Sequence, residues 1–73
     1  MTKRISKLGP GDRSSIRWLV GRIHVAETDE AVRENITKRA NPLLFTPGYI
    51  KAAGDYAVKV HHENQGLVKR MRF

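Results

Sequence analysis

The C-terminal part of the chain contains the longest helical pattern in the sequence. From residue 50 onward, residues that can line an apolar stripe recur at steps of three and four: Ile50, Ala53, Ala57, Val60, Asn64, Leu67 and Met71. That spacing puts them on one face of a helix, and mostly charged and polar residues fall on the opposite face. Thr46 and Pro47 supply an N-cap and a favoured first helical residue. The sequence therefore predicts a helix over residues 47–72, about 39 Å long at about 1.5 Å per residue.

The apolar face of this helix needs a partner, and the residues before it offer two shorter helices. Asp12 can cap a helix over residues 13–26, whose apolar residues Ile16, Leu19, Val20 and Ile23 have helical spacing. Thr28 is a second N-cap candidate, and two carboxylates follow it, where they complement the helix dipole. We expect this second helix to cover residues 29–40 and to end before the Asn41-Pro42 pair.

The two shorter helices could instead be one. No proline or glycine forbids helix between Arg22 and Ala40. A continuous helix over residues 13–40 would be apolar on two sides and would need two partners. A break gives a self-contained three-helix bundle, whereas continuity gives a helical hairpin that must oligomerise. We favour the break, because Thr28 begins a local helix-start signal, and the hairpin remains the alternative.

The predicted fold class is all-α: a small three-helix bundle or helical hairpin with a long C-terminal helix. Residues 1–11 are expected to form a flexible basic arm, because Gly9-Pro10-Gly11 is a turn sequence, and residues 12–73 a single helical domain. A chain of 73 residues buries only a marginal core, so we expect a homo-oligomer. A polar Asn64 within the apolar stripe is typical of residues that set helix register. The expected interface residues are Trp18, Tyr49, Tyr56, Asn64, Leu67 and Met71.

Several classes of chemistry find no support in the sequence. There is no cysteine, which excludes disulfides, thiolate metal sites and cysteine nucleophiles. His61 and His62 are adjacent, so they project about 100° apart on a helix, and neither has a second histidine four residues away. No serine lies in a nucleophile-elbow pattern. We therefore predict no enzyme, metal or cofactor, and with no long apolar run we expect a cytoplasmic protein without a membrane partner.

The charge favours a polyanionic partner. The net charge is +7, and both ends of the chain are basic while its middle is acidic. Such positive charges neutralise phosphates and release counterions. We therefore expect a nucleic-acid-binding protein, DNA or RNA, that contacts phosphates through Lys3, Arg4, Lys7, Arg13, Arg17, Arg22, Lys38, Arg39, Lys69, Arg70 and Arg72.

A helical interaction module is the competing hypothesis. Trp18 lies about 160° from Ile16 around the first helix, beside Arg22, where it would be a contact platform or an interface anchor. A compact, basic, motif-poor chain of this kind also suits a bacteriophage accessory protein that binds and inhibits a protein partner or holds an anionic ligand.

Overall fold

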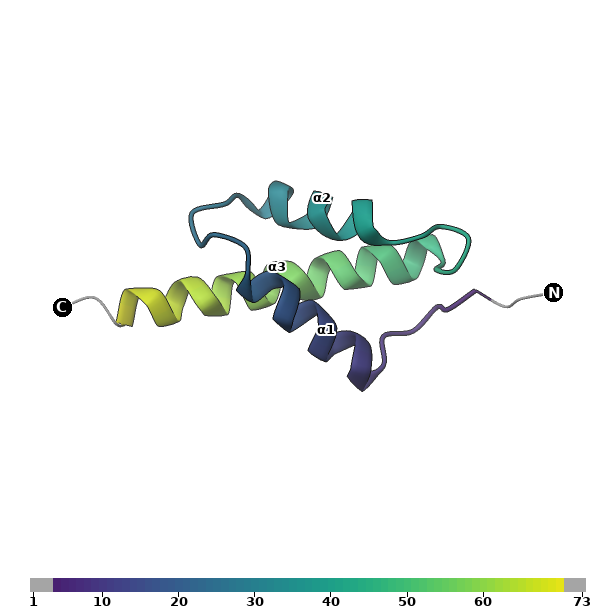
Figure 1. The fold of residues 1–73 in the computed structure, drawn as a ribbon, viewed down its shortest axis with the longest axis horizontal. Helices are drawn as coiled ribbons and strands as arrows, with labels where there is room; N and C mark the ends of the chain where they lie inside the picture. Colours follow the sequence, from purple (N-terminus) through teal and green to yellow (C-terminus); the bar gives the residue numbers. More distant parts are fainter. Residues whose placement is uncertain (1–3, 71–73) are drawn as a thin grey trace.

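Three helices make up the described part of the chain, residues 4–70, in the computed structural model (Figure 1). They are α1 (Pro10–Gly21), α2 (Asp29–Arg39) and α3 (Pro47–Arg70). Within residues 4–70 the only β-type pairing is an isolated bridge, and no strand forms. The prediction of an all-α fold with three helices is confirmed.

α3 is the central element of the molecule. α2 runs antiparallel to it and α1 crosses it obliquely, so that both pack on α3 but make far fewer contacts with each other (Figure 1). The arrangement follows from the apolar stripe of α3, which is buried over its first two thirds by one short apolar face from each partner. The buried apolar residues are Ile16 and Val20 of α1, Val32 and Ile36 of α2, and Tyr49, Ala53, Ala57, Val58 and Val60 of α3.

The helix breaks between α1 and α2, so the continuous helix over residues 13–40 does not form. α1 ends at Gly21, earlier than the expected residue 26, because glycine is a poor helix former and the chain tightens there. The amides of Arg22 and Ile23 donate to carbonyls only three residues back, at 3.1 and 2.9 Å. Residues 22–28 then lead into α2, where the Thr28 side chain accepts a hydrogen bond of 3.1 Å from the Ala31 amide.

α1 begins at Pro10, inside the sequence expected to be a turn. Proline suits the first helical position because its missing N–H would have no partner there. Asp12, expected to be the N-cap, instead accepts a 3.0 Å hydrogen bond from the backbone amide of Gly9, which is the N-cap.

The segment before α1 is attached to the start of α3. The Ile5 amide donates to the Leu44 carbonyl at 2.7 Å, and the Thr46 amide donates to the Ile5 carbonyl at 3.0 Å. Residue 5, which lies in the segment expected to be a flexible arm, is thus held by two backbone hydrogen bonds to the connection between α2 and α3.

α3 continues through both of its glycines to Arg70. Gly54 is buried beneath the Arg33 side chain of α2, where a Cβ would lie 3.5 Å from the guanidinium in ordinary contact. Arg33 also pairs with Asp55 at 2.5 Å. None of the helices within residues 4–70 combines the length and apolar character needed to cross a bilayer.

Tyr49 links the first turn of α3 to α1, and its ionisation gives the fold an alkaline limit. Its ring stacks on Phe45 with centroids 4.5 Å apart, and only 6% of its surface is exposed. Burial raises the pKa of the Tyr49 phenol above its usual 10.0, and the nearby Asp12 carboxylate raises it further. A group with a raised folded-state pKa stabilises the fold below its unfolded-state pKa, and that contribution is lost as the pH rises through the folded-state value.

We therefore expect the free energy of unfolding to fall as the pH rises above about 10, with part of the fall due to Tyr49. Urea unfolding measured at steps between about pH 8 and about pH 11 checks this. Tyr49→Phe keeps the stacked ring and removes the titrating group, so its curve should be flatter than that of the parent protein. Parallel curves for the two proteins would contradict the assignment.

Candidate nucleic-acid interface

Trp18 is the largest exposed aromatic side chain in the described part of the chain. It lies on α1 away from the buried Ile16 and Val20, and 65% of its surface is accessible. Arg22, the C-cap residue of α1, places its guanidinium carbon 4.9 Å from the centre of the indole ring. Such a cation–π contact at an exposed site is worth about 0.5–1 kcal/mol. It holds a positive charge beside the aromatic surface.

A hollow of about 280 Å³ lies beside Trp18, between α1 and α2. It exists because both helices rest on α3 without closing against each other. Its lining residues are Trp18, Leu19, Arg22, Ile23, Asn35 and Arg39. We call it the Trp18 hollow.

The α2 wall of the Trp18 hollow is polar and oriented by a hydrogen bond. Arg39 Nε donates to Asn35 Oδ1 at 2.9 Å, which fixes the side-chain amide. Within residues 4–70 the Asn35 NH₂ group donates to no other group, so both of its N–H bonds are available to a ligand. The Trp18 hollow thus combines an aromatic wall, two guanidinium groups and a free amide donor pair.

An apolar cleft of about 240 Å³ continues the Trp18 hollow toward the start of α3. Leu19 and Arg39 border both spaces. Its other lining residues are Asp12, Ser15, Ile16, Ile36, Ala40, Phe45, Tyr49 and Ala53. Because the only acidic lining residue, Asp12, lies in the apolar cleft, an anionic ligand would favour the Trp18 end.

A third, more basic hollow lies on the other side of α2. It has a volume of about 320 Å³, and Arg4, Arg33 and Lys51 line it together with Phe45, Ile50 and other residues near the start of α3. Arg33 is already paired with Asp55, which leaves Arg4 and Lys51 as its cations without an ion pair within residues 4–70.

The structure gathers only some of the predicted phosphate contacts into one place. Arg22 and Arg39 both line the Trp18 hollow. Arg17 instead donates to the Tyr56 hydroxyl at 2.6 Å and lies 3.9 Å from Glu63, and Lys38 lies 3.6 Å from Glu34. Arg4, Lys7 and Arg13 are exposed and form no ion pair within residues 4–70. Lys3 and Arg72 lie outside the described residues, as do the side chains of Lys69 and Arg70.

The predicted interface residues also lie in different surroundings. Tyr49 is buried in the chain's own core, and Tyr56 is half-buried beneath Arg17. Asn64 is half-buried, Leu67 is 54% exposed, and Met71 lies outside the described residues. Among the predicted interface residues that the structure describes, only Trp18 and Leu67 are more than half exposed.

Sequence reasoning missed Asn35, although a signal was present. Asn35 and Arg39 are four residues apart on one helix, a spacing at which their side chains meet. The spacing alone does not show that this pair lines a hollow, because the hollow forms only when α1 and α2 pack on α3.

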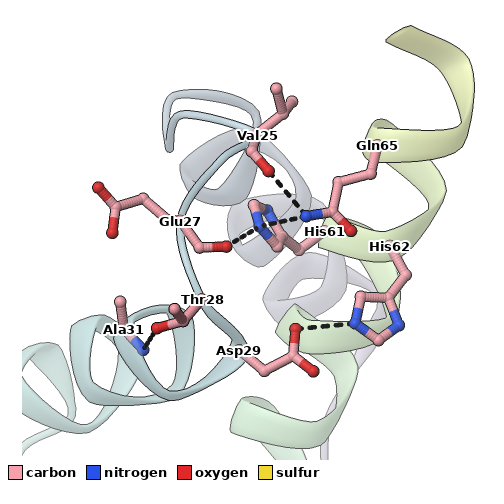
Figure 2. A network of polar contacts seen from close by, with 8 residues as sticks. All are labelled: Val25, Glu27, Thr28, Asp29, Ala31, His61, His62 and Gln65. Carbon is pink, nitrogen blue, oxygen red and sulfur yellow. Dashed lines mark hydrogen bonds and ion pairs between the residues drawn. The ribbon is translucent and has the colours of Figure 1, made fainter. Parts of the chain in front are cut away.

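The two adjacent histidines of α3 contact the residues that lead into α2 (Figure 2). His61 is fully buried, and its Nε2–H donates to the Glu27 carbonyl at 2.9 Å. One turn later, Gln65 Nε2 donates to the Val25 carbonyl at 2.7 Å, while His62 Nε2 lies 2.8 Å from Asp29 on α2. Among residues 4–70, no three histidine, aspartate or glutamate side chains lie together as they would to hold a metal ion. The network ties residues 25–29 to α3.

Comparisons of the chain with known protein families, with curated proteins and with solved structures find no match. The side chains described above are therefore the basis for inferring function.

Proposed function

We propose that this protein is a non-enzymatic, single-stranded nucleic-acid-binding protein. The observation that carries the proposal is the exposed Trp18 at the wall of a hollow that also holds Arg22, Arg39 and Asn35. Stacking on an aromatic ring together with cationic contacts to the backbone is how proteins bind unpaired nucleotides.

Each wall of the Trp18 hollow has a role in this proposal. The indole accepts the face of a base, the guanidinium groups of Arg22 and Arg39 neutralise phosphate, and the Asn35 amide donates to a base edge. A base within a duplex has both faces covered by its neighbours, so stacking on Trp18 requires an unpaired or extruded base. This favours a single strand over a duplex.

The remaining positive charge supports the same proposal over longer range. With a net charge of +7 the molecule attracts polyanions, and exposed cations such as Arg4, Lys7 and Arg13 extend the attraction beyond the hollow. Binding should therefore weaken steeply as salt rises. The basic terminal segments predicted from the sequence belong to this general attraction, and the Trp18 hollow to the recognition of bases.

The experiment uses the indole itself as the probe, because Trp18 is the only tryptophan in the chain. Adding a short single-stranded oligonucleotide at low salt should quench its fluorescence, and a hairpin of the same composition should quench it less. Trp18→Ala, followed by fluorescence anisotropy of a labelled strand, should lose about 10- to 100-fold in affinity, since one stacked base contributes about 1–3 kcal/mol. The fold should survive, because the side chain is mostly exposed.

Matched charge variants separate the hollow from general attraction. Arg39→Gln removes a cation from the hollow, and Lys59→Gln removes an exposed cation from α3, outside the hollow. The first should weaken binding more than the second at equal salt. Undetectable binding at low salt, or parental affinity in Trp18→Ala, would overturn the proposal.

The apolar cleft supports a second candidate function, an interaction module. Ile16, Leu19, Ile36 and Phe45 line a space that an apolar side chain of a protein partner could fill. Ile36 is only 6% exposed, so a partner side chain would have to enter the cleft to contact it. Trp18→Ala distinguishes the two candidates, because Trp18 does not line the apolar cleft and its loss should leave protein binding there intact.

A further inference from the structure

The end of α3 extends beyond the rest of the molecule. Figure 1 shows the yellow C-terminal turns of α3 projecting past α1 and past the connection that leads to α2. Among the α3 side chains that the structure describes, which end at Val68, the last with a hydrogen bond to another segment is Gln65, which donates to the Val25 carbonyl. We call the helical residues after Gln65 the α3 overhang.

The α3 overhang carries an apolar surface that nothing in the described chain covers. Leu67 and Val68 are 54% and 41% exposed, whereas Val60, two turns before Leu67, is 3% exposed. Helical spacing places Leu67 seven residues after Val60, on the same face that α1 and α2 bury closer to the core. The burying face of α3 is therefore longer than the two helices that cover it.

The charges beside this surface are arranged with opposite signs along the helix. Glu63 is exposed at the base of the α3 overhang, and its contact with Arg17 is loose, at 3.9 Å. Position 70, seven residues later, is an arginine, and three of the four residues from 69 to 72 are lysine or arginine. The sequence thus has residues of opposite charge at positions 63 and 70, which helical spacing puts on one side of a helix.

We infer that the α3 overhang pairs with the same segment of a second copy, antiparallel and about a two-fold axis near Leu67. An antiparallel arrangement places Leu67 and Val68 of the two copies against each other and sets Glu63 of each copy opposite position 70 of the other. A parallel arrangement would instead bring the two basic tips together. A two-fold contact of this kind is self-complementary and closes at two copies.

The pairing is weak because the surface is small. The α3 overhang offers a few residues from each copy, well short of the roughly 800 Å² per partner in a standard interface. We therefore expect a dissociation constant in the range of about 10 µM to about 1 mM. This dimer uses no residue of the Trp18 hollow, so it stands or falls separately from nucleic-acid binding.

Sedimentation equilibrium from about 10 µM to about 1 mM should show a mass that rises with concentration toward that of two chains. Leu67→Glu should raise the dissociation constant at least about tenfold, since it removes apolar burial from both copies. Leu43→Glu is the matched control, because Leu43 is 81% exposed in the connection before α3 and should leave the association unchanged. Circular dichroism checks that both variants keep their helices.

A charge exchange tests the antiparallel geometry. Glu63→Arg should weaken the dimer by placing like charges opposite each other, and adding Arg70→Glu to that variant should restore it. Monomeric mass over the whole concentration range, equal association in Leu67→Glu and the parent, or no recovery in the exchanged double variant would each overturn the inference.

Discussion

His61→Ala is expected to lower the free energy of unfolding by about 3 kcal/mol, a large fraction of the stability of so small a domain. The side chain is fully buried between α3 and residues 25–29. Its removal leaves a cavity and takes away the donor that satisfies the Glu27 carbonyl. His61 Nδ1 has no hydrogen-bond partner in the described part of the chain, so the contribution of the ring rests on its packing and its Nε2 bond.

The neighbouring histidine provides the control for His61. His62 pairs with Asp29 at 2.8 Å, but more than half of each side chain is exposed. An exposed pair of this kind contributes about 0–1 kcal/mol, so His62→Ala should change stability little. Thermal unfolding followed by circular dichroism should show the difference, because a loss of 1 kcal/mol shifts the midpoint by about 4–8 °C in a chain of this size. Equal shifts for the two variants would contradict the structural role of His61.

Ile36→Ala is expected to cost about 3 kcal/mol as well, within the range for buried isoleucine. α2 is a polar helix whose only buried residues are Val32 and Ile36, so Ile36 is one of the two side chains that it buries in the core. The expected result is an earlier unfolding midpoint in urea, together with weaker helical signal at intermediate concentrations as α2 separates.

Thr37→Ala is the control on the same helix. Thr37 is exposed, and its hydroxyl donates to the Arg33 carbonyl of its own helix at 3.0 Å. Alanine is the better helix former, so the change in stability should stay within about 0.5 kcal/mol. A loss comparable to that of Ile36→Ala would contradict the view that α2 is stabilised mainly by its buried side chains.

The helices were predictable where local signals agreed with the tertiary structure. α3 has both a sustained apolar period and the Thr46-Pro47 start, and α2 has its Thr28 cap. The start of α1 was harder, because Gly9-Pro10-Gly11 fits a turn and a helix N-terminus equally well by its local preferences. In the structure this segment begins a helix, and the Asp12 side chain accepts a hydrogen bond from the amide of the N-cap residue Gly9.

The candidate site was predictable only in part. Helical geometry alone placed Trp18 away from the core-facing stripe, and the structure has it 65% exposed. The convergence of Arg22 with Asn35 and Arg39 depends on the separation of α1 from α2 over α3, which no local pattern encodes. The burial of His61 has the same origin, since only the path of residues 22–28 decides which of two adjacent histidines is covered.

Because α1 and α2 make few contacts with each other, each is held in place mainly by its own packing on α3. α2 and α3 are neighbours in sequence and pair through a short connection, so this hairpin depends on contacts close together along the chain, the kind that form fastest. Because α1 makes few contacts with α2, we expect α1 to separate from α3 in a local opening of lower free energy than complete unfolding. Such an opening would widen the Trp18 hollow, whose walls come from both sides, and we expect a bound ligand to hold α1 and α2 at a fixed spacing.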